Sequence, residues 1–511
     1  MSVAPPPVHS SPQLIAYADR LGGSIARLTE LLRGPLRGAF GGVHLLPFYR
    51  PYDGADAGFD PEDHTEVDPR LGAWNDIHAL ADTHTVMADV IVNHMSAHSA
   101  QFRDVIADGD ASPYSGMFLT MGAVFPDGAT ETALADIYRP RPGLPFTAMT
   151  LGGQRRLVWT TFTPEQVDLN IDDPATWTYL TSIVDRLTSA GVTMLRLDAV
   201  GYVGKQAGTN CFMTSKADRF VSQLREYAHR RGARVLLEVH GHYMQQVELA
   251  RAADWVYDFA LPPLALHALH ARDPKPLARW LTVRPANVVT VLDTHDGIGI
   301  VDIGASTLRP DIPGLLTEAQ IDALVESIHT SSNGTSRLAT GAAASNLDLY
   351  QVNSTFYDAL GRDDRLYLLA RLIQLFLPGT PQIYYVGLLA GGNDVELLER
   401  TGVGRDVNRH RYQADEIEAE LRRPVVRAQL SAIGMRAGHP AFRGAFTQSL
   451  RDDVLTLQWN GDDACATLQI DFLDLSHRLT SVIESKLATV DDLMALPEIA
   501  STWDATAGSA S

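Results

Sequence analysis

The run Met194-Leu195-Arg196-Leu197-Asp198 is strand-like and largely apolar, and it ends on a carboxylate. Two later runs end in a similar way, Val235-Leu236-Leu237-Glu238-Val239-His240 and Val289-Thr290-Val291-Leu292-Asp293-Thr294-His295-Asp296. A carboxylate at the end of a buried strand is costly to hold, so it is rarely there for packing alone. Three of them at successive strand ends predict a set of carboxylates that converges on one pocket. Such a set suits a reaction that passes through an oxocarbenium-like centre, as glycosyl transfer does.

The regions around these runs alternate between apolar β-rich segments and amphipathic helical segments, in which apolar residues recur at three- and four-residue spacing. The expected strands are 14–17, 43–48, 86–92, 193–197, 235–239, 255–259, 288–292 and 382–386. Eight strands that alternate with helices predict an α/β fold, a (β/α)8 TIM barrel. In such barrels the chemistry lies at the carboxyl ends of the strands, where the three carboxylates also stand.

Two stretches interrupt the alternation of strands and helices, and in a third the apolar residues recur with a period of two. We expect a disordered tail over 1–13, a catalytic barrel made of 14–92, 173–297 and 362–441, and two loop-rich insertions. The first insertion, 93–172, follows the third strand, and the second, 298–361, follows the seventh. From 442 to 511 the apolar residues alternate with period two around the turn sequence Asn460-Gly461-Asp462-Asp463, which predicts a C-terminal antiparallel β domain.

The excess of acidic residues argues against nucleic acid and anionic membranes as partners. The chain of 511 residues has 42 Lys and Arg against 61 Asp and Glu, a formal charge of −19, which repels nucleic acid and anionic membrane surfaces. An anionic substrate therefore needs a local cationic group. Two cysteines without a CxxC partner, and an N-terminus without a signal-peptide pattern, indicate a cytoplasmic protein without a structural metal.

The neighbours of the three carboxylates indicate different roles for them. Arg196 precedes Asp198 by two residues and shares its strand face, so it is expected to lower the Asp198 pKa and keep a nucleophile ionised. Apolar neighbours are expected to raise the pKa of Glu238, as a proton donor needs. Asp296, beside His295, is expected to stabilise the charge that develops on a sugar carbon. Each carboxylate taken alone is also compatible with a structural ion pair.

Three histidines also stand at strand ends, at His94, His240 and His295. Metal ligation is possible, but no HxH or HExxH spacing at a strand end argues for it strongly, and neutral imidazoles suit hydrogen bonds to sugar hydroxyls. A loop after the second strand, Tyr52-Asp53-Gly54-Ala55-Asp56-Ala57-Gly58-Phe59, offers Asp56 to hydroxyls and the ring of Phe59 to an apolar face. That loop is equally compatible with a plain turn.

At these residues the chain resembles the α-amylase superfamily of glycoside hydrolases. The matching pieces are Asp89-Val90-Ile91-Val92-Asn93-His94, Leu195-Arg196-Leu197-Asp198-Ala199-Val200, Glu238-Val239-His240 and Asp293-Thr294-His295-Asp296. The resemblance implies a retaining α-glycosidase or transglycosidase that needs no cofactor. It assigns Asp198 as nucleophile, Glu238 as general acid/base and Asp296 as transition-state stabiliser.

Within the superfamily the chain is similar to the sucrose phosphorylases, from about residue 14 to about residue 440. Motifs that stand in the same order include Asp53 to Asp60, Tyr138 to Phe146, Asn346 to Asn353 and Gly404 to His410. The resemblance implies sucrose, inorganic phosphate, glucose 1-phosphate and fructose as substrates and products, no metal, and a homodimer. It places Asp56, Phe59, His94, Arg196, His295 and Arg405 at the glucosyl subsite. It places Pro140, Arg141, Tyr202, His240, Leu347, Asp348, Tyr350 and Gln351 at the acceptor side.

The acceptor side also carries a departure from that pattern. His240-Gly241-His242-Tyr243 stands where a Ser followed by two Tyr is more usual, and Ser96-Ala97-His98-Ser99 replaces a Trp-containing stretch. Phosphorylases that act on sucrose 6′-phosphate, glucosylglycerol or glucosylglycerate therefore stay open as alternatives. A sucrose hydrolase and a non-catalytic sugar-binding relative are more distant ones. Arg141, whose planar fork binds phosphate, is the leading candidate for the local cation.

Overall fold

The computed structural model describes residues 11–54, 56–139, 143–306, 312–341 and 351–500 of the chain. The tail expected over 1–13 lies outside these residues except for its last three positions. Gln13, the last of them, already begins the first strand.

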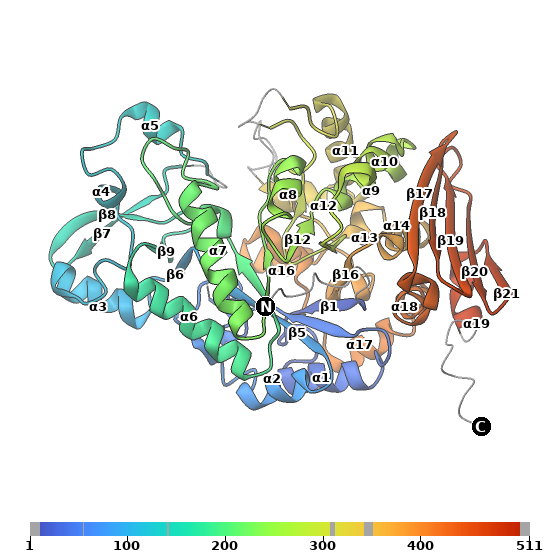
Figure 1. Cartoon of the computed structure of the whole chain (residues 1–511), viewed down its shortest axis with the longest axis horizontal. Coiled ribbons are helices and arrows are strands. Elements are labelled where there is room, and N and C mark those ends of the chain that lie inside the picture. Colours follow the sequence, from blue (N-terminus) through green and yellow to red (C-terminus); the bar gives the residue numbers. More distant parts are fainter. Residues whose placement is uncertain (1–10, 55, 140–142, 307–311, 342–350, 501–511) are drawn as a thin grey trace.

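Eight parallel strands close into a barrel at the centre of the molecule (Figure 1), which confirms the (β/α)8 prediction. The strands are β1 (Gln13–Ala16), β2 (Gly42–Leu45), β5 (Thr85–Ile91), β10 (Met194–Asp198), β11 (Arg234–Leu237), β12 (Trp255–Asp258), β13 (Val288–Thr290) and β16 (Thr380–Tyr384). Their order around the barrel is β1-β16-β13-β12-β11-β10-β5-β2. Each overlaps one of the eight strands expected from the sequence. The carboxyl ends of β10, β11 and β13 therefore open on one face.

Helices surround the barrel, and local sequence sets where they begin. Ser24 accepts a hydrogen bond from the backbone N–H of Arg27 at the start of α1, and Thr214 accepts one from Ala217 at the start of α7. The helices that follow the barrel strands are α1 (Ile25–Arg33), α2 (Trp74–Ala81), α6 (Pro174–Ser189), α7 (Ser215–Arg230), α8 (Tyr243–Leu249), α9 (Leu261–Ala271), α10 (Lys275–Val283) and α14 (Asp364–Phe376). Their apolar faces pack on the strands and leave the strand ends for the loops.

The segment between β5 and α6 has its own short elements, on the far side of the molecule from the C-terminal sheet (Figure 1). They are β6 (His94–Ser96), α3 (Ala100–Asp108), α4 (Met121–Val124), α5 (Glu131–Ala135), β7 (Phe146–Leu151), β8 (Gln154–Trp159) and β9 (Gln166–Asp168). β6 and β9 pair in antiparallel register, with His94 opposite Asp168. This pairing brings residues from the end of the segment back to the mouth of the barrel.

The segment after β13 contains β14 (Ile298–Gly299), α11 (Glu318–Ser331), α12 (Thr335–Thr340), β15 (Gln351–Val352) and α13 (Phe356–Ala359). β14 and β15 pair in antiparallel register, and Gly299 lies opposite Gln351. The pairing fixes Gln351 at the mouth of the barrel although it is far from β13 in sequence. A hairpin of β3 (Tyr49–Arg50) and β4 (Asp63–Val67) encloses the loop that carries Asp56 and Phe59.

The chain ends in a five-stranded antiparallel sheet beside the barrel. It comprises β17 (Ala445–Arg451), β18 (Val454–Asn460), β19 (Ala464–Asp471), β20 (His477–Ile483) and β21 (Lys486–Val490). Alternate residues of β18 and β19 are buried, as the period-two pattern predicted. The helices that precede and follow this sheet are α15 (Tyr385–Leu388), α16 (Val395–Thr401), α17 (Ala414–Glu420), α18 (Pro424–Gly438) and α19 (Leu496–Ile499). Among the described residues, none of the helices is long and apolar enough to cross a bilayer.

Candidate active site

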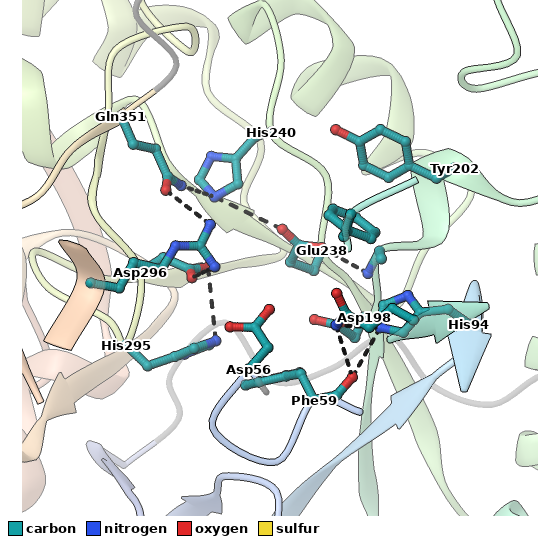
Figure 2. Close-up of a pocket in the computed structure, with 14 residues that line it drawn as sticks. Asp56, Phe59, His94, Asp198, Tyr202, Glu238, His240, His295, Asp296 and Gln351 are labelled. Atoms are coloured by element: carbon teal, nitrogen blue, oxygen red, sulfur yellow. Dashed lines mark hydrogen bonds and ion pairs between the residues drawn. The ribbon is translucent and has the colours of Figure 1, made fainter. Parts of the chain in front are cut away.

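A pocket opens at the carboxyl ends of the barrel strands (Figure 2). The lining residues are Asp56, Phe59, His94, Phe162, Gln166, Asp198, Ala199, Tyr202, Glu238, His240, His295, Asp296, Gln351 and Arg405. The three carboxylates that end β10 and follow β11 and β13 thus face one cavity. Arg196 lies beneath it, on β10.

A chain of buried charges holds Asp198 in place. Arg196 Nη1 lies 2.7 Å from Asp198 Oδ1 and also contacts Asp89 on the neighbouring strand β5. His44 Nε2 lies 3.0 Å from the second oxygen of Asp89. Burial opposes ionisation of Asp89, but Arg196 and His44 outweigh it and lower its pKa to about 2. The guanidinium is therefore fixed between two carboxylates on adjacent strands, and Asp198 is fixed with it.

The pKa of Asp198 corrects one expectation from the sequence. Burial raises this pKa well above its ordinary value, and the charges of Glu238, Asp89 and Asp296 add to the effect against the opposing action of Arg196. The sequence-based expectation of a lowered pKa considered only the arginine two residues away. It left out the other carboxylates, which come from other strands. The carboxylate of Glu238 is therefore close enough to Asp198 for its charge to act on the nucleophile candidate.

The backbone ties Glu238 to the residue after Asp198. Ala199 has φ 54° and ψ 26°, in the left-handed region, which turns its N–H away from the strand direction. That N–H donates to Glu238 Oε2 over 2.9 Å. A strained backbone residue therefore sits between the two carboxylates and orients one against the other.

Asp296 is held by a guanidinium from a distant part of the chain. Arg405, in the 3-10 turn Gly404–Asn408, places Nη1 2.8 Å from Asp296 Oδ1. A second guanidinium nitrogen, Nη2, donates to Gln351 Oε1 over 3.3 Å. Burial disfavours the charged form of Asp296, yet Arg405, with smaller effects from His295, Arg196 and His240, holds its pKa below its usual range. Asp296 is therefore an anion at neutral pH.

Phe59 and His295 form one wall of the pocket. Their rings stack with centroids 4.8 Å apart and planes within 9°. Burial lowers the pKa of His295 to about 3, so the imidazole is neutral. His94 lies within 2.9 Å of the carbonyl oxygen of Phe59, and burial lowers its pKa as well. Neutral imidazoles beside an apolar ring and Asp56 make a surface suited to a sugar ring with several hydroxyls.

His240 and Tyr202 lie on the other side of the carboxylates. His240 Nε2 is 3.8 Å from Glu238 Oε1 and 3.2 Å from Gln351 Nε2, and Nδ1 is 2.9 Å from Asp302. Tyr202 packs among aromatic rings, with the Phe162 ring centroid 5.1 Å away. The ring of His240 stacks on Phe259 at 3.8 Å. These contacts hold both side chains at the mouth of the pocket.

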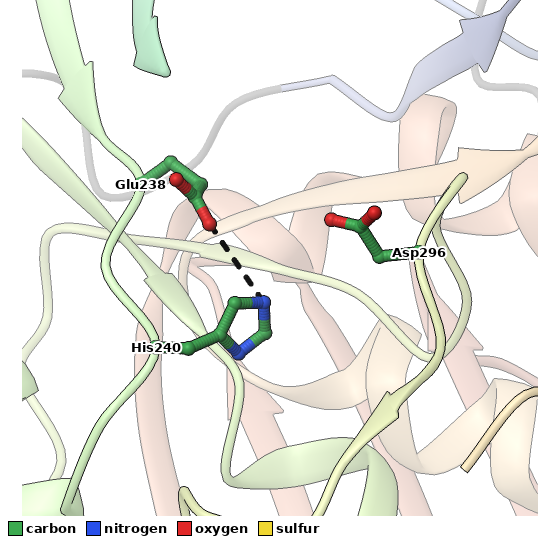
Figure 3. Close-up of side chains that lie close together, drawn as sticks. All are labelled: Glu238, His240 and Asp296. Atoms are coloured by element: carbon green, nitrogen blue, oxygen red, sulfur yellow. Dashed lines mark ion pairs between the residues drawn. The ribbon is translucent and has the colours of Figure 1, made fainter. Parts of the chain in front are cut away.

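Glu238, His240 and Asp296 could in principle share a metal ion, because their ligand atoms lie within 4.8 Å of one another (Figure 3). The positive charge that such an ion would supply is already present beside Asp296, in the guanidinium of Arg405. The Nε2 atom of His240 already accepts a hydrogen bond from an amide. The donor set therefore fits an organic substrate better than a resident ion.

Some site residues were missed from the sequence, and others lie outside the described part of the chain. Phe162, Gln166 and Ala199 line the pocket, and no period or spacing pointed to the first two. The β6–β9 pairing explains Gln166, whose amide reaches the Phe59 carbonyl over 3.3 Å. Of the residues expected on the acceptor side, Pro140, Arg141, Leu347, Asp348 and Tyr350 lie outside the described residues.

Known proteins share this architecture and much of this sequence. The model of the α-amylase catalytic domain matches residues 39–250. The chain is 55% identical to a sucrose phosphorylase of Bifidobacterium adolescentis over 458 residues, 89% of this chain and 91% of that protein. It is 54% identical to a sucrose phosphorylase of Agrobacterium vitis, over 91% of this chain and 95% of that one.

A solved structure agrees with these relatives. The crystal structure of sucrose 6F-phosphate phosphorylase from Thermoanaerobacter thermosaccharolyticum superposes with a TM-score of 0.86 at 34% identity, and covers 94% of this chain and 97% of that one. The barrel, the pocket with its three carboxylates and the similarity over most of the chain all indicate the same family. The chain belongs to the sucrose phosphorylase family of α-amylase-type enzymes, which are retaining glycosyltransferases.

Proposed function

We propose that this enzyme is a sucrose phosphorylase, which converts sucrose and inorganic phosphate reversibly into α-D-glucose 1-phosphate and fructose. The observation that carries the proposal is the pocket in which Asp198, Glu238 and Asp296 face one cavity. Identity of 55% to a sucrose phosphorylase over most of the chain supports the choice of substrate.

In the first half of the reaction, Asp198 attacks the anomeric carbon of the glucosyl unit. The bond from that carbon to the fructosyl oxygen breaks, and Glu238 gives its proton to this oxygen. A β-glucosyl ester forms on Asp198, and fructose leaves. Positive charge develops at the anomeric carbon on the way, and the anion of Asp296 stabilises it.

In the second half, a phosphate oxygen attacks the same carbon from the face that fructose left. The ester bond to Asp198 breaks, and Glu238 is available to take a proton from phosphate. Two inversions leave the α configuration unchanged. This route needs the two carboxyl groups to lie about 5–5.5 Å apart. The hydrogen bond from Ala199 N–H fixes the position of the Glu238 carboxyl relative to the end of β10.

The surrounding residues divide between the two halves of the substrate. We assign Asp56, Phe59, His94, Arg196, His295 and Arg405 to the glucosyl ring. Tyr202, His240 and Gln351 are assigned to the acceptor, together with Pro140, Arg141, Leu347, Asp348 and Tyr350. The charge of −19 is unfavourable for phosphate, so the acceptor side needs a local cation, and Arg141 is proposed for that role.

The proposal is tested by incubating the purified protein with sucrose and phosphate and assaying glucose 1-phosphate. We expect its formation to match the fructose released, with the α anomer as the sole glucosyl phosphate. Release of free glucose in place of glucose 1-phosphate would identify a hydrolase instead. Asp198→Asn is the control, and a variant that turned over sucrose at the wild-type rate would overturn the assigned nucleophile.

Acceptor choice is tested in the reverse direction, from glucose 1-phosphate with competing acceptors. Fructose is expected to outcompete fructose 6-phosphate, glycerol and glycerate at equal concentrations. Preference for fructose 6-phosphate would place the enzyme with the Thermoanaerobacter protein instead. Preference for glycerol or glycerate would identify it with the other two phosphorylase activities considered.

Assembly and location complete the proposal. We propose a cytoplasmic homodimer. The two cysteines, Cys211 and Cys465, are free thiols, which fits a reducing compartment. Light scattering on the purified protein tests the assembly, with an expected mass of twice the 55.7 kDa of one chain.

A further inference from the structure

Asp302 is a buried carboxylate that touches the acceptor side of the pocket only through His240. It lies in the turn after β14 and is fully shielded from solvent. Its Oδ2 atom is 2.9 Å from His240 Nδ1. Its Oδ1 atom accepts hydrogen bonds from Gly241 N over 3.1 Å and from Gln246 Nε2 over 3.0 Å. Oδ1 is thus an acceptor of two hydrogen bonds, and Oδ2 faces the ring nitrogen of His240.

Three hydrogen bonds fix the direction of the network around His240. A guanidinium only donates, so the atom of Gln351 that faces Arg405 is its carbonyl oxygen. The amide NH₂ of Gln351 therefore faces His240 Nε2, at 3.2 Å. Nε2 must accept this hydrogen bond, so the ring proton is on Nδ1, where it is donated to Asp302.

The packing around the ring allows little movement. Phe259 stacks on one face with its plane within 13° of the imidazole. Gly299 passes so close that a Cβ there would lie 2.2 Å from Asp302 Oδ2 and 3.3 Å from His240 Nδ1. Among the described residues, the charged groups that face the ring are Glu238 after β11 and Asp296 after β13 (Figure 2), Asp302 after β14 and, through Gln351, Arg405.

We propose that Asp302 is a positioning residue: by holding the Nδ1 proton of His240, it makes Nε2 the nitrogen that takes up a proton when an anionic acceptor enters the pocket. The inference rests on the proposed function and names a residue that sets its choice of acceptor. The proton comes from solvent or from dihydrogen phosphate, and the new N–H donates to an anion oxygen in place of the bond from Gln351. Fructose is neutral and needs no such charge.

The electrostatics agree with this direction. Burial of the ring disfavours the imidazolium, but the carboxylates of Asp302, Glu238 and Asp296 outweigh it and raise the pKa of His240 above its ordinary value. A folded-state pKa above the ordinary value means that the charge is present at low pH and is lost as pH rises through the raised pKa. Anion binding through Nε2 should fall over the same interval.

Asp302→Asn is the decisive variant, because an amide cannot accept at both ends. If the Asn oxygen keeps Gly241 and Gln246, its NH₂ faces Nδ1, so Nδ1 must accept and the ring is neutral with its proton on Nε2. The variant therefore offers an anion an N–H donor without the positive charge that the Asp302 carboxylate supports. We expect the KM for phosphate to rise about tenfold or more, while the KM for sucrose and the rate of sucrose hydrolysis without phosphate change by less than about twofold. The basic limb of kcat/KM for phosphate should move to lower pH.

Gln246→Met is the matched control, since it removes a hydrogen bond to the same carboxylate but keeps the charge beside His240. Its KM for phosphate is expected to stay within about threefold of wild type. The proposal is wrong if the control matches Asp302→Asn, if phosphate and sucrose KM values rise together, or if the pH profile of Asp302→Asn does not move. Thermal unfolding of both variants shows whether either change acts through folding.

A measurement on the wild-type enzyme keeps the proposal testable even if Asp302→Asn does not fold. Sulfate carries no proton between about pH 6 and 9, so its binding reports proton uptake by the protein alone. Calorimetry in buffers of different ionisation enthalpy should show uptake that grows towards one proton as pH rises, and it should vanish in His240→Gln. Sulfate binding without proton uptake would overturn the inference. Absence of glucose 1-phosphate formation would refute the proposed function. The sulfate experiment does not depend on turnover, so the failure of the activity and the failure of the inference are distinguishable.

Discussion

Arg405 contacts both Asp296, which we propose to stabilise the developing charge, and Gln351, which we assign to the acceptor side. Removing one partner of such a pair costs about 2–5 kcal/mol, so Arg405→Ala should lower kcat/KM for sucrose at least about thirtyfold. Without the guanidinium the pKa of Asp296 rises, and the acid limb of the pH profile should move to higher pH. Arg405→Lys, which keeps the charge, should lose less. An unchanged acid limb in Arg405→Ala would contradict this account.

Lys205 provides a test of stability beside the pocket. Its ammonium is buried between Asp168 and Asn93, 2.6 Å from Asn93 Oδ1, directly behind His94. Lys205→Met leaves Asp168 buried without its cation, which should lower the free energy of unfolding by about 3–5 kcal/mol. Lys216→Met breaks an exposed pair with Asp172 and should cost at most about 1 kcal/mol. Urea unfolding of the two variants provides the comparison, and equal losses would contradict the buried role of Lys205.

At the scale of elements, the turn that carries Arg405 packs closely against the end of α12, and Gly404 makes this contact possible. A Cβ at Gly404 would lie 2.1 Å from the carbonyl oxygen of Ala339, at the end of α12, and this backbone atom cannot easily yield. Gly404→Ala should therefore displace the turn and lower sucrose turnover about tenfold or more, by misplacing Arg405. Gly434→Ala, in the interior of α18 with open space around it, should leave activity unchanged and stabilise by up to about 1 kcal/mol. Steady-state rates and melting temperatures distinguish the two.

The elements also show which parts could be predicted from sequence. Short apolar runs predict the barrel strands. Asp198, Glu238 and Asp296 stand at or just beyond the ends of these strands, so the sequence was enough to locate the three carboxylates. Gln166 and Asp302 could not, because long-range pairing and a turn bring them to the site. The prediction of a lowered Asp198 pKa was wrong for a related reason: burial raises this pKa most, and the carboxylates that add to it, Glu238, Asp89 and Asp296, belong to other strands.

For the whole molecule, the junction of barrel and C-terminal sheet should decide how the chain unfolds. Trp459 of β18 is fully buried, and its indole N–H donates to the carbonyl oxygen of Phe376, at the end of α14, over 2.6 Å. Trp459→Ala should cost about 3–5 kcal/mol, whereas Leu487→Ala, at a side chain 69% exposed, should cost less than about 0.5 kcal/mol. Activity and far-UV dichroism should be lost together in urea, since the two units share this core. Separate transitions would show that the sheet is an independent domain.

Ala199 has a consequence for how such enzymes diverge. Its left-handed backbone carries the N–H that holds Glu238, so the main chain sets the placement of the proposed acid beside the proposed nucleophile. Side chains around the acceptor can then be exchanged without disturbing the stereochemical course. A lineage can move from one acceptor to another while every member delivers the same anomer. The α configuration of the product therefore depends on the backbone at Ala199, whereas the preference for one acceptor over another depends on side chains in the loops.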